Sequence, residues 1–186
     1  FVFVDRYPST GDFQAVTSDN RDGGRRLAEH SLQEGATLLI NTLDTYNTVI
    51  AERHHGVADA VRDHPPVTAI APETISAAAL EGHETVALVA NGQGEALEFI
   101  RTHAALLGDK RLVCAVFDEW IGNPSPAVRV YVARQDFITM GAQASERLMA
   151  LIRRETPSGP GVVRVPMLRV DRIDGILQNP PRDKIV

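Results

Sequence analysis

Short apolar runs alternate with longer amphipathic segments along most of the chain. The apolar runs predict strands, and residues 1–4 are apolar throughout, which is typical of a sheet covered on both faces. The segments between them carry apolar residues at helical spacing and predict helices. We expect strands at 1–5, 15–17, 37–43, 67–71, 85–90, 111–117, 128–132 and 162–170. We expect helices at 20–33, 48–63, 95–107 and 135–154, and a short one from 72 to about 82.

Capping and turn residues support these boundaries. Asp19 and Asp44 precede two predicted helices, where an acidic side chain commonly caps the first turn. Gly35 follows the first of these helices, and Pro65-Pro66 ends the second. Strands that alternate with helices over about 100 residues predict parallel βαβ units, and therefore an α/β fold with a doubly wound parallel sheet.

Polar side chains stand at or just after the predicted strands. In a doubly wound sheet the ligand lies at the carboxyl ends of the strands, so these residues are candidates for binding. Asp and Asn accept hydroxyl protons, Arg offers a planar fork of donors, and an aromatic ring can cover the apolar face of a sugar. The alternative role for Asp19 and Asp44 is helix capping. The candidates are Asp5, Asp19, Asp44, Tyr46, Arg53, Asn91, Asp118 and Trp120.

Composition and charge narrow the classes of function. The chain of 186 residues carries 19 Lys and Arg against 24 Asp and Glu, a formal net charge of −5, which disfavours a nucleic-acid-binding surface. Cys114 is the only cysteine, so neither an intrachain disulfide nor a cysteine-rich zinc site can form. No apolar run is long enough for a membrane span. We expect no cofactor, no metal and no membrane contact.

The chain resembles the effector-binding domain of LacI/GalR-type transcriptional regulators, which share the periplasmic-binding-protein fold. The segment R-H-H-G-V-A-D-A at 53–60 is similar to the family pattern R-x-x-G-[FY]-x-x-A, and V-F-D-E at 116–119 is similar to V-G-[FY]-D-[DN]. Val116 and Gly92 depart from the usual residues at their positions. The similar segments follow in family order and lie at 2–6, 16–30, 53–60, 86–91, 116–119, 135–144 and 166–172.

The resemblance implies a protein that binds an effector and catalyses nothing. It places Arg53 and Asp118 where the family holds effector hydroxyls or ring nitrogens, and Asp5, Asp19 and Asn91 at further effector-facing positions. Asn47 stands where purine-binding members carry an arginine, which favours a sugar or sugar phosphate as the effector. Lobe closure around the effector would then shift the population of the closed form.

The resemblance also implies a division into lobes. Residues 1–17 and 134–161 correspond to part of a proximal lobe, residues 18–133 and 162–172 to a complete distal lobe, and residues 173–186 to a C-terminal tail. The family's helix-turn-helix has no counterpart here, so we expect DNA contact only through that missing segment. We also expect a fragment of a larger domain, a homodimer and a cytoplasmic location.

Two alternatives stay open at the level of sequence. A sugar-binding protein of a transporter has the same fold, and fold alone does not decide function. A nucleotide-dependent enzyme is suggested by Gly92-x-Gly94 after a strand, with Asp118 in the place of a ribose-binding acid. Leu97 stands where the third glycine of that fingerprint is needed, which disfavours the enzyme.

Overall fold

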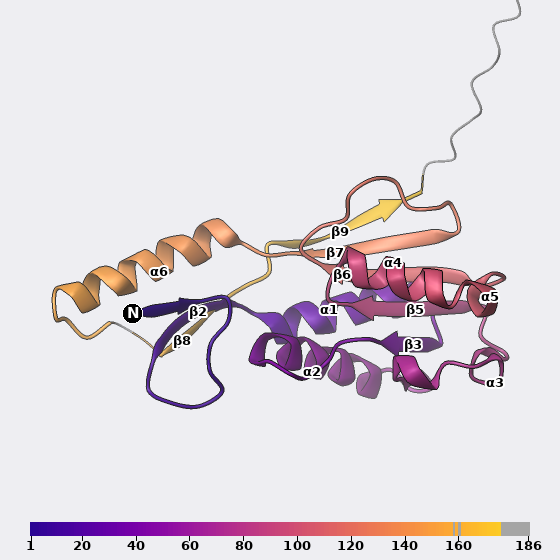
Figure 1. Ribbon diagram of the computed structural model, residues 1–186, viewed down its shortest axis with the longest axis horizontal. Coiled ribbons are helices and arrows are strands. Elements are labelled where there is room, and N and C mark those ends of the chain that lie inside the picture. The colour runs from indigo at the N-terminus through magenta and orange to yellow at the C-terminus, as the bar shows by residue number, and fades with distance from the viewer. Residues whose placement is uncertain (158, 160, 176–186) are drawn as a thin grey trace, which may run out of the picture.

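The computed structural model describes residues 1–157, 159 and 161–175. Within these residues the strands form two sheets, one of three strands in the order β1-β2-β8 and one of six in the order β4-β3-β5-β6-β7-β9 (Figure 1). The strands are β1 (Val2–Val4), β2 (Gln14–Ser18), β3 (Leu38–Asn41), β4 (Thr68–Ile70), β5 (Thr85–Ala90), β6 (Arg111–Phe117), β7 (Val128–Arg134), β8 (Val162–Val165) and β9 (Arg169–Asp174). The helices are α1 (Asn20–Gln33), α2 (Thr48–Asp63), η1 (Pro72–Thr74), α3 (Ala77–Leu80), α4 (Gln93–Thr102), α5 (Ala104–Leu107) and α6 (Phe137–Ile152).

The six-stranded sheet is doubly wound, as the alternation of strands and helices predicts. All its strand pairs are parallel except β7 with β9. Residues of α1 and α2, such as Leu27 and Val57, pack on one face of the sheet in a single buried cluster. Residues of α3, α4 and α5, such as Leu80 and Phe99, pack on the other face. Both faces of the central strands are therefore covered, which explains their unbroken apolar sequences.

The strand order reverses at β3. From β3 the chain continues outward to β4 at the edge and then returns to β5 on the other side of β3. Adjacent strands whose connections leave in opposite directions open a crevice at their carboxyl ends. Asn91 follows β5 directly and therefore lies at this crevice. Helix α2, which follows β3, begins at the same crevice.

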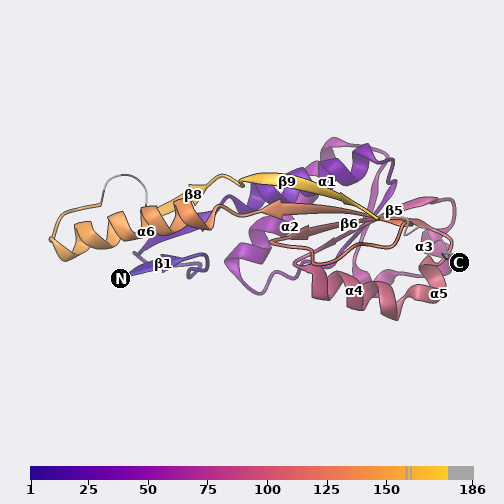
Figure 2. The ribbon, with the colours of Figure 1, turned by 90° about the horizontal axis from the view of Figure 1, so that it is seen from above.

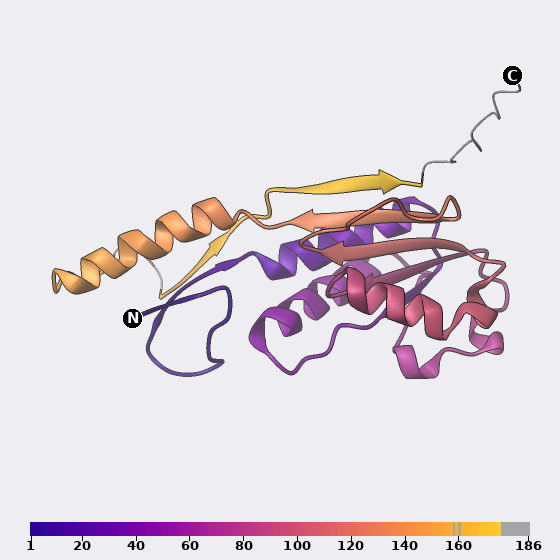
Figure 3. The ribbon, with the colours of Figure 1, turned by 45° about the horizontal axis from the view of Figure 1, so that its top comes forward.

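The three-stranded sheet forms a second, smaller unit with α6. Met140 and Ala144 of α6 pack on Val16 and Val165 of this sheet. Figures 2 and 3 show this unit at one end of an elongated molecule, with α6 beside β8 and β1. The chain passes between the two units after β2, after β7 and after β8. We refer to them below as the small unit (1–18, 135–165) and the large unit (19–134, 168–175).

Several expectations from the sequence need correction. The strand expected at 162–170 is two strands in different sheets: β8 pairs with β2, and β9 pairs with β7. Residues 162–165 therefore lie in the small unit and not with 166–172. The sequence does not reveal the break between the two strands, because Met167, which lies between them, is apolar and buried like a strand residue. Pro166, which has no N–H, directly follows β8.

The ends of the chain also differ from the expectation. The strand β1 is not covered on both faces, since Phe1 is 85% and Val4 50% exposed. Ile173 and Asp174, expected in a tail, belong to β9. The rest of the expected tail, residues 176–186, lies outside the described residues.

Two expected helices are each interrupted. Ser76 caps α3 by accepting a hydrogen bond from the N–H of Ala79, which separates α3 from η1. His103 ends α4 and precedes α5, and its ring nitrogen contacts the carbonyl of Phe99. Over the described part of the chain, no helix has the length and apolar character needed to cross a membrane.

Candidate functional site

Arg53 is the centre of the candidate site. Its side chain extends from α2 into the crevice and is only 3% exposed. Its Nε donates to Asn20 Oδ1 at 2.8 Å, its Nη1 donates to Asn91 Oδ1 at 2.5 Å, and its guanidinium lies 3.9 Å from the centre of the Phe117 ring. Burial lowers the pKa of Arg53 from its ordinary value, while the carboxylates of Asp118 and Asp5 act to raise it. The three neighbours hold the guanidinium plane in one orientation.

Two glycines explain how α2 brings Arg53 to this place. A Cβ on Gly24 of α1 would lie 2.1 Å from the carbonyl oxygen of Arg53, and a Cβ on Gly56 would lie 2.0 Å from that of Arg21. The backbones of α1 and α2 therefore touch, which only glycine permits at these positions. Gly56 follows Arg53 by three residues, one helical turn, so the R-x-x-G pattern encodes both the contact and the side chain it positions.

Two carboxylates face the guanidinium from different units. Asp5 follows β1 of the small unit, and Asp118 follows β6 of the large unit. Both have left-handed backbones, with φ of 68° and 72°. This conformation is costly for residues other than glycine and is concentrated at functional sites. The structure thus brings together Asp5, Arg53, Asn91 and Asp118, four of the residues that the sequence proposes.

The two carboxylates differ in their hydrogen bonds. The carboxylate of Asp118 accepts from Gln135 Nε2, and its backbone carbonyl accepts from Arg134 Nη1 at 2.7 Å. Asp5 Oδ1 is buried and has no hydrogen-bond partner among the described residues. Burial raises the pKa of Asp5, and the negative charge of Asp118 adds to this, whereas Arg53 and Arg6 act to lower it. The Asp5 side chain as a whole is 37% exposed, so its other carboxylate oxygen is free to accept a hydrogen bond from solvent or a ligand.

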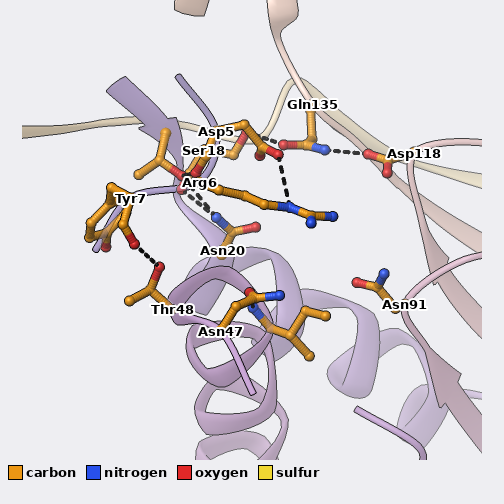
Figure 4. A network of polar contacts seen from close by, with 12 residues as sticks. Asp5, Arg6, Tyr7, Ser18, Asn20, Asn47, Thr48, Asn91, Asp118 and Gln135 are labelled. Atoms are coloured by element: carbon orange, nitrogen blue, oxygen red, sulfur yellow. Dashed lines mark hydrogen bonds and ion pairs between the residues drawn. The ribbon is translucent and has the colours of Figure 1, made fainter. Parts of the chain in front are cut away.

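Figure 4 shows several of these polar side chains around one space. Asp5, Arg6 and Gln135 come from the small unit, and Asp118 and Asn91 come from the large unit. Gln135 points to Asp118, and the side chain of Arg6 extends toward the same region. Among the residues that the structure describes, Arg6 forms one loose ion pair, with 3.9 Å between its Nε and Asp5 Oδ2, and its side chain is 66% exposed. The space is thus bordered by hydrogen-bond donors and acceptors and by side chains of positive and of negative charge.

The other candidates lie outside this cluster or at its margin. Asp19 caps α1 by accepting from the N–H of Asp22 at 3.1 Å, and Asn47 caps α2 by accepting from Ile50 at 2.9 Å. Tyr46 is 69% exposed. Trp120 is buried among the core residues on the α4 side of the large sheet. The capping alternative is therefore correct for Asp19 and wrong for Asp44, since Asn47 is the residue that caps α2.

Some residues of the cluster were missed in the sequence. Asn20 is fully buried, donates to Thr17 Oγ1 and Ser18 O, and accepts from Arg53. Gln135 accepts from the hydroxyl of Ser18 at 2.6 Å and so connects the passages after β2 and β7. The sequence did contain a signal for both residues. Each is a polar residue between the end of an apolar strand and the start of a helix, the position where the chain turns at the crevice.

Two hollows border the cluster. One, of about 630 Å³, is lined by Asp118, Glu119, Arg134, Gln135, Phe137, Leu168 and Arg169. The other, of about 390 Å³, lies between the loop after β1 and the start of α2, and is lined by residues 7–9, 45–48 and 51. A third, of about 500 Å³, lies at the opposite ends of β6 and β7, where Arg111 and Arg129 are paired with Glu34. Within the described part of the chain, no group of His, Cys, Asp or Glu is arranged to hold a metal ion.

Comparison of the structure with known proteins gives the fold. No family model and no curated protein matches the sequence. The periplasmic binding protein/LacI transcriptional regulator from Alkaliphilus metalliredigens, complexed with D-xylulofuranose, is similar with a TM-score of 0.68 at 15% identity, over 94% of this chain and 70% of that one. The chain has the type I periplasmic-binding-protein-like fold.

Two further solved structures agree with this assignment. The Cra transcriptional dual regulator from Pseudomonas putida, in complex with fructose 1-phosphate, gives a TM-score of 0.66 at 16% identity, over 92% of this chain and 68% of that one. GanP, a glucose-galactose binding protein from Geobacillus stearothermophilus, gives a TM-score of 0.62 at 18% identity, over 93% of this chain and 66% of that one. The predicted fold class and the expected likeness to LacI-type effector domains are confirmed.

Proposed function

We propose that this chain is the effector-sensing part of a LacI-type transcriptional regulator and that its effector is a sugar or sugar phosphate. The observation that carries the proposal is the buried guanidinium of Arg53, held by Asn20 and Asn91 and faced by Asp5 and Asp118. Carboxylates and amides that surround a fixed guanidinium suit adjacent hydroxyls, each of which donates and accepts a hydrogen bond. The likeness to sugar-complexed regulators supports the same conclusion.

The proposed site binds and does not transform its ligand. Its groups reach the ligand from both units, since Asp5 belongs to the small unit and Arg53, Asn91 and Asp118 to the large one. A ligand that contacts both binds the closed arrangement more tightly than the open one and shifts the population toward it by that difference. We further propose that the whole protein is a homodimer and that DNA contact requires an element outside these 186 residues.

A panel of sugars tests the proposal. Differential scanning fluorimetry and isothermal titration calorimetry would be run with D-xylulose, D-glucose, D-galactose and fructose 1-phosphate. We expect at least one to raise the midpoint of unfolding by mass action. Asp118→Asn, which keeps the size of an exposed side chain, should weaken that binding by about 10-fold or more, the equivalent of about 1.4 kcal/mol.

A matched control keeps the result specific. Asp59 on α2 is also a carboxylate and is paired with Arg21 and Arg62 away from the site. Asp59→Asn should leave the sugar affinity unchanged. If every sugar fails with the parent protein, or if Asp118→Asn binds as the parent does, the proposed site is wrong.

A second candidate is a sugar-binding protein of a transporter, which the likeness to GanP favours. The sugar titration does not separate the two, because both would bind. The gene sequence upstream of the Phe1 codon separates them. A helix-turn-helix there supports the regulator, whereas a secretion signal supports the transport protein.

A further inference from the structure

A cluster of four side chains outside the sugar site joins the two units. Tyr7 Oη donates to Glu52 Oε1 at 3.1 Å, and Arg164 Nη2 donates to the same oxygen at 2.6 Å. Thr48 Oγ1 donates to the backbone carbonyl of Tyr7 at 2.9 Å, as Figure 4 shows. Tyr7 and Arg164 belong to the small unit, and Thr48 and Glu52 to α2 of the large unit. We call these four residues the Glu52 cluster.

Apart from this cluster and the chain passages, where Gln135 donates to Asp118 and Asn20 donates to Thr17, little else in the described residues fixes the angle between the units. The helices and strands of the small unit pack extensively on one another, as do those of the large unit, but no such packing joins an element of one to an element of the other in the described residues. Apart from the chain passages, side-chain bridges therefore carry the contact. Units joined by so small an interface are expected to move relative to one another.

The chemistry of Glu52 makes the bridge reversible. Its Oε2 is buried without a hydrogen-bond partner among the described residues, and its Oε1 is shared by two donors. A desolvated carboxylate with one unsatisfied oxygen loses much of what its ion pair gains. Opening the bridge returns Glu52 to water and removes this cost, which offsets part of what the ion pair contributes to closure.

The cluster is directly continuous with the sugar site. Glu52 precedes Arg53 on α2, and Tyr7 follows Asp5 and Arg6 on the loop after β1. The ring of Tyr7 also contacts Phe13, with centroids 5.7 Å apart, which ties it to the small unit. Whatever holds Tyr7 against α2 therefore holds Asp5 and Arg6 opposite Arg53.

We propose that Glu52 is a positioning residue that closes the small unit on α2 and thereby sets the affinity of the sugar site. Its effect on affinity rests on the proposed function, but its effect on closure does not. Loss of the cluster lowers the fraction of closed protein, and the apparent dissociation constant rises by the inverse of that fraction.

The test measures closure and affinity separately. Labels for single-molecule energy transfer are attached through Ser145→Cys on α6 and Thr102→Cys on α4. The native Cys114 is buried, which raises its pKa to about 12, and so stays unlabelled. Glu52→Gln should shift the distance between labels toward longer values without ligand and should raise the dissociation constant for D-xylulose or the best-binding sugar about 10-fold. Asp59→Asn, on the same helix, should change neither.

A second variant guards against misfolding. Tyr7→Phe keeps the ring contact and removes only one donor to Glu52. It should therefore lengthen the distance between the labels and raise the dissociation constant about 3-fold. An unchanged distance in Glu52→Gln, or an equal change in Asp59→Asn, overturns the proposal. If Glu52→Gln does not fold, Tyr7→Phe decides by the same two readouts. If the distances shift as expected but no sugar binds even to the parent, the closure stands and the proposed function fails.

Discussion

At the residue scale, Asp5 of the candidate site is held in an arrangement that costs stability. Its Oδ1 is buried without a partner among the described residues, and its backbone is in the left-handed region. An unsatisfied buried acceptor and a left-handed backbone each cost folding free energy. The Asp5 side chain as a whole is 37% exposed, so its other carboxylate oxygen is open to a hydrogen-bond donor.

Replacing Asp5 should separate stability from binding. Burial raises the pKa of Asp5, so its charged form is disfavoured in the folded state. The folded protein then binds this proton more tightly than the unfolded chain, and stability falls as pH rises from the ordinary value of 3.8 through the raised pKa. We expect Asp5→Asn to raise the thermal midpoint at pH 7 and this gain to vanish below about pH 4.

Thermal melts of Asp5→Asn and the parent from pH 3 to 8, together with a sugar titration, check this prediction. The variant should be more stable at neutral pH and should bind more weakly. A gain in stability that is equal at pH 3 and pH 7 would mean that the charge of Asp5 is not its source.

At the scale of elements, the crossing of α1 and α2 decides where the site lies. Gly24 and Gly56 bring the two backbones into contact, and Arg53 extends from α2 beside that contact. The sequence supplied the helix bounds of 20–33 and 48–63, which the structure confirms, because caps and apolar spacing are local signals. It did not supply the reason for the glycines, because the atoms they avoid lie on another helix.

Gly56→Ala should disturb both the fold and the site. The added Cβ would lie 2.0 Å from the carbonyl oxygen of Arg21, so the helices must separate. Overpacking of this kind costs about 1–3 kcal/mol. The shift of α2 also moves Arg53, so we expect weaker sugar binding. Urea unfolding and calorimetry measure the two effects.

Gly141→Ala is the matched control. Gly141 lies inside α6, and a Cβ there would meet nothing within 4 Å. Alanine is favoured over glycine in a helix interior by about 1 kcal/mol. The variant should be slightly more stable and bind sugar as the parent does. Equal effects of the two substitutions would show that helix propensity, and not the α1–α2 contact, governs Gly56.

At the scale of the whole molecule, α6 has two apolar faces, and the described residues cover only one of them. Met140 and Ala144 are buried against the small sheet. Phe137 and Leu148 stand at helical spacing with these two residues, but the structure leaves them 59% and 42% exposed. Spacing alone does not show this, because helical periodicity reports that residues share a face and not whether anything covers it. The exposed apolar residues of α6 are Phe137, Ile138, Leu148, Met149 and Ile152.

Two substitutions on α6 should therefore have opposite consequences. Ile138 is 87% exposed, so Ile138→Glu should change stability by less than about 0.5 kcal/mol and should lower light scattering at high protein concentration. Met140 is 1% exposed, so Met140→Ala should cost about 2–5 kcal/mol. Chemical unfolding and static light scattering test both. A large loss of stability in Ile138→Glu would show that this face is covered.

The sequence by itself determined the doubly wound fold, most strand and helix bounds, and the residues that stand at strand ends. These follow from local signals: apolar periodicity, caps and breakers act over a few neighbouring residues. Only the tertiary structure decided that β8 and β9 separate into two sheets, that Asn20 and Gln135 join the site, and that Trp120 belongs to the core. Each of these features depends on contacts between segments that are distant in the sequence. The amide of Asn20, for example, is held by Arg53, which lies more than 30 residues away.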